Sequence, residues 1–262
     1  MKIHRIKALI IRHLYLYQRS LPRLMDIFFW PILELMLWGF LSVYLQKMNM
    51  GKINVVTVLL GAIIFWDLLS QSQRAISTSF LEDVWEKNFI NVFVTPLKIS
   101  EFLASTVVLG FIRIFMVAIV MSLIAFFLYQ FSILYFGFHL ILFGLNLLLF
   151  GWALGLFTTG IILRYGTSAQ VLAFGFIFLI QPFSAVFYPV SALPKSVQFI
   201  SNLLPSTHVF EGMRAVIATG NFPTSELLWA LLLNMFYLTL VLWFFYRMFA
   251  RVKIKGTMMK LD

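Results

Sequence analysis

Hydrophobic residues form long, nearly uninterrupted runs along this chain. A helix that crosses a bilayer needs about 20 consecutive, mostly apolar residues. Six runs approach or reach that length, and their predicted boundaries are residues 24–46, 54–73, 101–128, 137–162, 168–188 and 225–247. The pattern therefore predicts an all-α, polytopic membrane protein in which residues 1–262 form a single transmembrane domain.

Proline interrupts the apolar stretch between the fifth and sixth runs. Pro189, Pro194 and Pro205 divide it into pieces that are too short to cross a bilayer. Because proline breaks the helical hydrogen-bond ladder and lipid offers no replacement partners, such a segment must be buried in protein or line a cavity. We therefore predict a re-entrant helical segment at residues 189–222, a feature typical of transport machinery.

The residues before the first run have an amphipathic helical pattern. Arg5, Arg12 and Arg19 repeat every seven residues and fall on one side of a helix, while apolar residues occupy another side. We expect residues 1–23 to form a helix along the membrane interface. This helix can be a surface anchor or a lever that touches a cytoplasmic partner, and one helix can do both.

The segment between the second and third runs is too amphipathic for a simple linker. Apolar residues recur at helical spacing beside three acidic side chains; the apolar positions are Phe80, Val84 and Trp85, and the acidic ones are Glu82, Asp83 and Glu86. Pro96 ends the predicted short helix. Such a helix can dock an aromatic side chain into a partner's groove, or it can lie on the membrane surface and bind nothing.

Three charged residues fall inside predicted spans: Glu34, Asp67 and Arg113. An intramembrane charge costs at least about 2.5–3.5 kcal/mol unless it is paired or hydrated, so these side chains should face protein or water. Counted from the cytoplasmic ends of their runs, Glu34 and Arg113 have similar depths. We expect them to form a structural ion pair, and contact with a substrate is the other interpretation.

The distribution of charge separates this chain from nucleic-acid-binding proteins. The net charge is +10, but the basic residues gather beside the apolar runs, where anionic lipid headgroups and membrane topology explain them. Fifteen Lys and Arg residues fall on one predicted side and four on the other. The positive-inside rule then predicts that both termini are cytoplasmic and that residues 248–262 are a basic cytoplasmic tail. We expect the membrane to be a bacterial inner membrane.

Composition offers little for catalysis. The chain has no cysteine, which excludes disulfides, thiolate nucleophiles and cysteine-ligated metals. Its four histidines are dispersed without the spacing of metal ligands, and no G-x-S-x-G element or G-x-x-x-x-G-K-[ST] phosphate loop is present. We expect no metal site, no cofactor in this chain and no enzymatic activity of its own.

Short motifs occur in a specific order along the chain. Thr95-Pro96-Leu97 ends the amphipathic segment, Tyr188-Pro189 closes the fifth run, Leu193-Pro194 opens the broken segment, and Leu204 to Thr207 and Glu211 to Arg214 follow. With the six runs, this order resembles the membrane permeases of type-2 ABC exporters over essentially the whole chain. Many members carry a Gly-Thr-Leu-Glu-like sequence where this chain has Lys87 to Ile90, so the acidic docking contact could come from Glu82, Asp83 or Glu86.

The resemblance implies a division of labour with other subunits. A second copy or a homologous permease would complete the pathway, and a separate ABC ATPase dimer would hold ATP and Mg. Residues 77–97 would be the coupling helix region, and its ATPase-coupling residues would be Phe80, Val84, Trp85, Glu86, Phe89, Thr95 and Pro96. The re-entrant segment would act as an outer gate through Tyr188, Pro189, Pro194, Pro205, Glu211 and Arg214.

The function expected from this resemblance is ATP-driven export of an amphipathic substrate, such as a lipid, a lipid-linked glycan or a drug. The scarcity of intramembrane charges favours an amphipathic cargo over a highly polar one. One alternative is a non-transporting membrane anchor or assembly protein that recruits a cytoplasmic partner. Another is an ion-driven secondary transporter, for which Glu34 is the acidic residue at a suitable depth.

Overall fold

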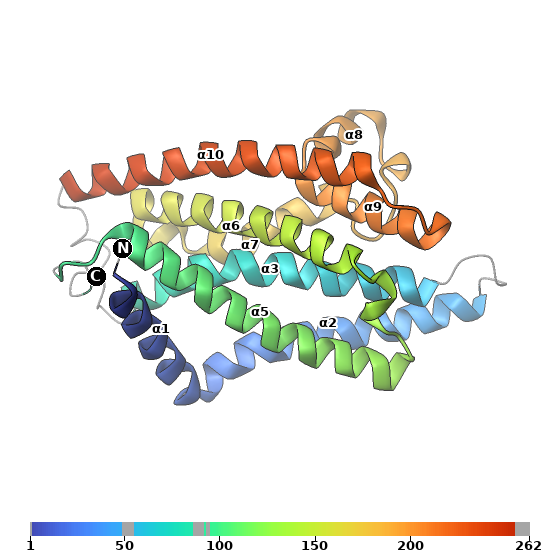
Figure 1. Ribbon diagram of the computed structural model, residues 1–262, viewed down its shortest axis with the longest axis horizontal. Coiled ribbons are helices and arrows are strands. Elements are labelled where there is room, and N and C mark those ends of the chain that lie inside the picture. Colours follow the sequence, from blue (N-terminus) through green and yellow to red (C-terminus); the bar gives the residue numbers. More distant parts are fainter. Residues whose placement is uncertain (1, 49–54, 86–91, 93–94, 255–262) are drawn as a thin grey trace.

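The structure is a computed structural model that describes residues 2–48, 55–85, 92 and 95–254. Within these residues it is all-α, as predicted, and contains no strand. Its α-helices are α1 (Ile3–Gln18), α2 (Leu21–Met48), α3 (Val55–Trp85), α5 (Ile99–Tyr129), α6 (His139–Tyr165), α7 (Val171–Ile180), α8 (Lys195–Asn202), α9 (Pro205–Thr219) and α10 (Thr224–Ile254). The long helices run along the longest axis of the molecule (Figure 1).

The structure contains five helices that are long and apolar enough to cross a membrane, namely α2, α3, α5, α6 and α10. The predicted count of six spans is not confirmed. The fifth predicted run, 168–188, contains α7, which has 10 residues and continues into a short 3-10 helix at Gln181–Phe183. At 1.5 Å per residue, α7 is about 15 Å long, half of a typical hydrocarbon core.

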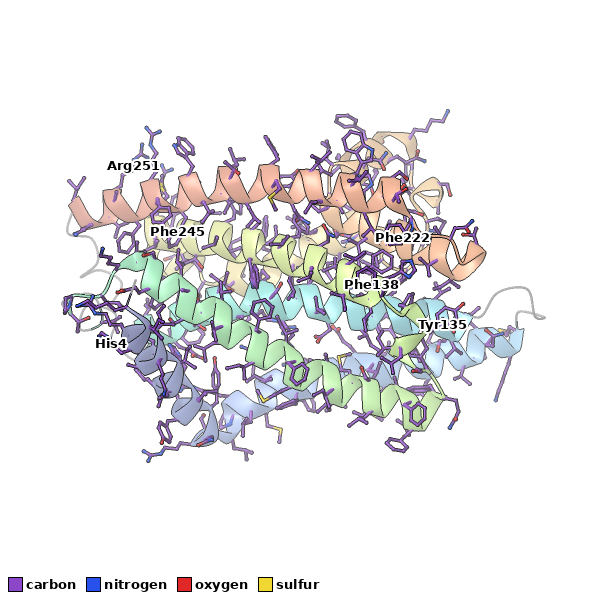
Figure 2. The ribbon with its side chains drawn as sticks, in the orientation of Figure 1. His4, Tyr135, Phe138, Phe222, Phe245 and Arg251 are labelled. Carbon is purple, nitrogen blue, oxygen red and sulfur yellow. The ribbon has the colours of Figure 1, made fainter. Side chains whose placement is uncertain are left out.

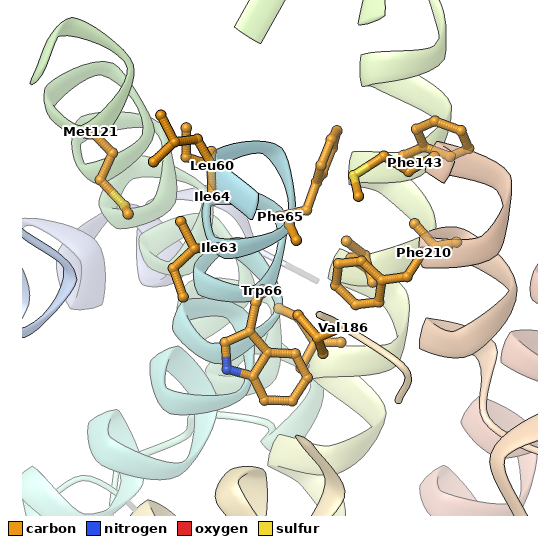
Figure 3. Packing of buried hydrophobic residues seen from close by; sticks show 14 of the residues in the cluster. Leu60, Ile63, Ile64, Phe65, Trp66, Met121, Phe143, Val186 and Phe210 are labelled. Atoms are coloured by element: carbon orange, nitrogen blue, oxygen red, sulfur yellow. The ribbon is translucent and has the colours of Figure 1, made fainter. Parts of the chain in front are cut away.

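Helix α3 lies at the centre of the bundle. It packs against α2, α5, α6, α7 and α9. Trp66 of α3 and Phe210 of α9 belong to the largest apolar cluster, together with residues of α5 and α6 (Figure 3). Gly151 and Gly155 allow α6 to approach α3 closely, because a Cβ atom at either position would lie 2.6–2.7 Å from a backbone oxygen of α3.

Helix α1 turns away from the direction of the spans. It crosses the bundle at the end where α3 stops, α5 begins and α10 stops, which we call the α1 end (Figure 1). Leu9, His13 and Tyr17 are buried at intervals of four residues, so one face of α1 packs on the protein. The predicted helix within residues 1–23 is therefore present at Ile3–Gln18, and its position at the membrane interface stays a prediction.

The opposite end, which we call the α9 end, holds the proline-rich segment. Pro194 is the N-cap of α8 and Pro205 is the first residue of α9, so each proline begins a helix. Proline suits these positions because the first turn of a helix needs no hydrogen bond from its nitrogen. The predicted breaks at residues 189–222 are therefore present, and entry of this segment into the membrane stays a prediction.

Helix α10 also differs from the prediction at its end. It continues to Ile254, so residues 248–254 of the predicted basic tail are helical. The remainder of that tail lies outside the described residues. Figure 2 shows Arg251 and His4 at the α1 end, and the aromatic side chains of Tyr135, Phe138 and Phe222 toward the α9 end.

Candidate functional site

The predicted coupling segment is an extension of a span. Helix α3 continues unbroken to Trp85, so residues 77–85 do not form a separate short helix after a loop. Phe80 and Val84 are 2% and 3% exposed and belong to an apolar cluster that includes Leu9 of α1. Neither side chain is therefore accessible for insertion into a groove of a partner protein. Their spacing predicted a helix, which is present as the end of α3, but residues 77–84 are buried on all sides and leave no apolar face for a partner.

The Arg12–Asp83 ion pair holds α1 against the end of α3. The Arg12 guanidinium donates a hydrogen bond to Asp83 Oδ1 at 2.6 Å, and His13 Nδ1 lies 3.5 Å from Glu82 Oε2. Both carboxylates are buried beside α1, so neither is exposed at the end of α3 to a docking partner protein. The Arg12–Asp83 bond is charge-assisted, stronger than a neutral one, and fixes α1 relative to α3.

Arg5 and Arg19 complete the predicted basic stripe, and they have different surroundings. Arg5 donates to the backbone oxygen of Pro96 and lies 3.4 Å from Glu101 Oε2. Arg19 is exposed just beyond the end of α1. Two of the three arginines therefore bind protein carboxylates, a role that the stripe pattern alone did not distinguish from lipid binding.

Glu101 is a residue that the sequence reasoning missed. Its carboxylate accepts hydrogen bonds from the backbone nitrogens of Lys2, at 2.7 Å, and of Lys98, at 3.0 Å. One side chain thereby joins the start of α1, the start of α5 and Arg5. Helix α5 has Lys98 as its N-cap and Glu101 at the N3 position of a capping box, whereas the predicted run began at residue 101 and so hid this position.

A groove of 440 Å³ separates α1 from the segment before α5. Its lining residues are Arg5, Ala8, Leu9, Arg12, Val92, Thr95, Pro96 and Leu97. Thr95 Oγ1 donates to the backbone oxygen of Val92 at 2.6 Å, which shapes one wall. Two predicted coupling residues, Thr95 and Pro96, therefore line an open groove, whereas Glu86 and Phe89 lie outside the described residues.

Trp85 ends α3 at the surface. Half of its side chain is exposed, its Nε1 donates to Gln170 Oε1 at 3.0 Å, and its ring stacks on that of Phe174 at a centroid distance of 6.5 Å. Of the apolar residues predicted to dock a partner on this helix, Trp85 is accessible, whereas Phe80 and Val84 are not.

The intramembrane charges do not pair as predicted. Arg113 Nη2 lies 3.6 Å from Asp26 Oδ2, and its Nη1 donates to Thr78 Oγ1 at 3.4 Å. The expected partner, Glu34, forms no ion pair with Arg113 among the described residues, so that prediction is wrong. Helix α5 crosses α2 obliquely (Figure 1), which brings the middle of α5 beside the first turns of α2. Depth counted along each run could not reveal that tilt.

Asp67 is paired within its own helix. Its Oδ1 accepts a hydrogen bond from Gln71 at 3.4 Å and lies 4.0 Å from Arg74 Nη2. Arg74 is also the cation whose charge acts on Glu34, which is half-buried on α2. The arrangement neutralises buried charge by pairing, as intramembrane carboxylates require. Among the described residues no group of three or more acidic or histidine side chains could hold a metal ion.

The predicted outer-gate residues come together at the α9 end. Glu211 of α9 accepts a hydrogen bond from the backbone nitrogen of Val190 at 2.7 Å and pairs with Arg214 at 3.0 Å. Tyr188 donates to the backbone oxygen of Pro182 at 2.5 Å. Pro189 is the N-cap of a short 3-10 helix at Val190–Ala192. Glu211 thus fastens the loop after α7 to α9, and the gating role stays a prediction.

A second set of polar contacts between helices at the α9 end was not predicted. His208 Nδ1 lies 2.7 Å from Glu226 Oε2, and His208 Nε2 lies 2.9 Å from the backbone oxygen of Asn202. This histidine joins α9 to α8 and to the first turn of α10. Its isolated position in the sequence offered no signal, because Asn202, His208 and Glu226 meet only in the fold.

Comparison with known protein families gives a match over most of the chain. Residues 4–218 match the model of a family described as ABC-2 type transporter. Among curated proteins, none matches the chain. The matched region contains α1 from its second residue, all of α3, the groove and the proline-rich segment as far as Ala218 of α9.

Proposed function

The chain belongs to the ABC-2 type transporter family, and we propose that it is the transmembrane permease subunit of an ATP-driven exporter. Its five long apolar helices make it a multi-pass integral membrane protein. We propose that the chain lies in a bacterial inner membrane with both termini on the cytoplasmic side. A second copy or a homologous permease would complete the pathway. A separate ABC ATPase dimer would bind and hydrolyse ATP with Mg, and the cargo would be an amphipathic lipid, lipid-linked glycan or drug.

One observation carries this proposal: α3 is a single helix from its exposed end at Trp85 to the core beside α9. Trp66 lies 6.5 Å from Phe210 of α9, measured between ring centroids. The 19 residues from Trp66 to Trp85 span about 28 Å at 1.5 Å per residue. Because the helix has no break in this stretch, a displacement at the α1 end would reach the predicted outer gate without a flexible joint.

The groove beside α1 is the surface that we propose for ATPase docking. It opens at the α1 end, and its walls move with α3 and α5 because Asp83 and Glu101 hold α1 in place. A partner helix seated in this groove would press on α1 and the Thr95–Pro96 segment together. The predicted lever, α1, and the predicted coupling residues Thr95 and Pro96 would then belong to the same docking surface.

Capture of the ATPase tests the proposal. The chain would be tagged and co-expressed with a candidate ABC ATPase, and the recovered ATPase would be quantified. Ala8→Trp fills the groove from an exposed position, so we expect it to abolish capture. Ile11→Trp is the matched control, since it adds a similar side chain on α1 at an exposed position outside the groove lining.

The two alternatives predict different results. A chain that captures no ATPase in its unaltered form would favour an anchoring protein or an ion-driven transporter, and the proposal would fall. Capture that survives Ala8→Trp would leave the exporter standing and move the docking surface away from the groove.

A further inference from the structure

A second cavity lies near the α1 end, where α1, α2, α3, α5 and α7 meet. Its volume is 290 Å³. Its polar lining consists of Tyr17, Arg23, Asp26, Thr78, Glu82 and Arg113. Burial raises the pKa of the Tyr17 phenol, and the nearby Glu82 carboxylate raises it further, so the phenol stays a neutral hydrogen-bond donor.

Arg113 is held in this cavity with little hydrogen bonding. Its side chain is 3% exposed, and its two polar contacts, to Thr78 and Asp26, are long at 3.4 and 3.6 Å. Its buried Nε and Nη2 atoms have no hydrogen-bond partner among the described residues. Buried donors are nearly always satisfied, and a guanidinium fork matches two oxygens of a phosphate. The arrangement therefore calls for an anionic oxygen ligand.

Glu82, in the same cavity, is a buried acceptor that lacks a hydrogen-bond donor. Its Oε2 atom is buried and accepts no hydrogen bond among the described residues, and its contact with His13 is 3.5 Å. The charged side chains that line the cavity are Arg23, Arg113, Asp26 and Glu82, so their formal charges cancel. A ligand that carries both a phosphate and an ammonium group meets both needs without adding net charge.

The remaining wall of the cavity is apolar and reaches the surface. Ile27 is buried there, and the stacked rings of Trp85 and Phe174 line the same space. Arg23 and Asp26 lie within about 8 Å of the start of α2, at 1.5 Å per residue, close to the turn that joins α2 to α1. Lipid headgroups sit at that depth of a bilayer, whereas a freely soluble phosphate has no use for an apolar wall.

We propose that this cavity binds the zwitterionic headgroup of a phospholipid of the phosphatidylethanolamine type, with the phosphate on Arg113 and the ammonium group on Glu82. The proposal rests on the proposed function only in treating the bound lipid, or a cargo with the same headgroup, as the molecule to be exported. Arg23 supplies a second guanidinium from α2, and Trp85 and Phe174 contact the glycerol backbone.

Native mass spectrometry of the purified full chain tests the site. The protein would be titrated with phosphatidylethanolamine, with phosphatidylglycerol and with soluble phosphoethanolamine. We expect the unaltered chain to prefer phosphatidylethanolamine and to resist displacement by the soluble headgroup. Arg113→Gln should weaken phosphatidylethanolamine binding about tenfold or more, because a charge-assisted hydrogen bond is lost. Arg247→Gln is the control, since Arg247 is an exposed arginine on α10 outside the cavity.

Two further variants keep the test decisive. Glu82→Gln should reduce the preference for phosphatidylethanolamine over phosphatidylglycerol, because it removes the acceptor charge for the ammonium group while Arg113 remains. If Arg113→Gln does not yield folded protein, Arg23→Gln tests the same cavity from α2 and should weaken binding of both lipids.

The proposal is overturned if phosphatidylglycerol binds the unaltered chain as tightly as phosphatidylethanolamine, if soluble phosphoethanolamine displaces the lipid, or if Arg247→Gln weakens binding as much as Arg113→Gln. This assay needs neither ATP nor a partner subunit. Loss of the headgroup preference with ATPase capture intact would therefore remove this site alone. Headgroup binding without ATPase capture would leave the site and remove the exporter.

Discussion

Helices α3 and α10 have the same length and opposite surroundings. Each has 31 residues and is apolar enough to span a membrane, yet 78% of an 18-residue apolar window is buried in the protein in α3 and 22% in α10. Helix α3 buries Asp67, Gln71 and Gln73, whereas the exposed side chains of α10 include Trp229, Phe236 and Trp243. Length and hydropathy do not distinguish the two helices, whereas the placement of polar side chains does.

The physical reason for this difference lies in the solvent. A polar side chain that faces lipid has no hydrogen-bond partner, so a helix rich in polar residues gains from a central position. Gln73 of α3 accordingly donates to the backbone oxygen of Ala173 at 3.1 Å. Helix α10 presents aromatic and aliphatic side chains that lipid solvates as well as protein does. If this explanation holds, equivalent substitutions in the two helices should have unequal effects.

The largest expected difference concerns tryptophan. Trp66 of α3 is 1% exposed, and Trp243 of α10 is 59% exposed. Trp66→Ala should lower the free energy of unfolding by about 3 kcal/mol, because it leaves a cavity in packed protein. Trp243→Ala should change it by less than about 0.5 kcal/mol, since lipid can fill the space. Thermal unfolding of the purified variants measures both, and equal losses would show that α3 is not packed as the fold indicates.

A smaller effect is expected where α6 approaches α3. A Cβ atom at Gly151 would overlap the Ser72 side chain and lie 2.6 Å from the backbone oxygen of Leu69. Gly151→Ala should therefore destabilise the protein by about 1–3 kcal/mol through overpacking. Gly144→Ala is its control on the same helix, because the nearest atom to a Cβ there is Leu68 Cδ1 at 3.8 Å. A stabilising Gly151→Ala would mean that the two helices are further apart.

The smallest effect tests the polar contact that α10 makes with α6. Asn234 is fully buried and donates to the backbone oxygen of Asn146 at 3.0 Å and to its side-chain oxygen at 3.1 Å. Asn234→Leu should cost about 0.6 kcal/mol, the average of an interhelical hydrogen bond in a membrane protein. Thr239→Val, at an exposed position bonded within α10, is the control. A loss of unfolding free energy above about 3 kcal/mol for Asn234→Leu in the same assay would show that buried polar contacts stabilise α10 as they do α3, which would contradict the comparison.

Local patterns predicted most of the helices of this protein, although α7 is shorter than its run and α3 continues into the predicted coupling segment. Apolar runs predicted five of its long helices, the heptad of arginines predicted α1, and three prolines predicted the breaks before α10. These predictions succeed because hydrogen bonding within a helix and the geometry of proline involve neighbours in the chain. The resemblance to ABC-2 permeases was also readable from ordered short motifs, and a family match over residues 4–218 confirms it.

Which residues of different helices contact one another could not be predicted from the sequence and is determined by the tertiary fold. The spacing of Phe80 and Val84 predicted an exposed docking face, but both are buried in a cluster with residues of α1, α5, α6, α7 and α10. Arg113 meets Asp26 because α5 crosses α2 obliquely. Asp83 and Arg12 are 71 positions apart, and no periodicity links them. Hydrophobic spacing shows that a helix has an apolar face, but which surface covers that face, and which charge neutralises which, follow from the tilt and register of packed helices. Those are properties of the whole bundle, since each contact depends on where every other helix lies.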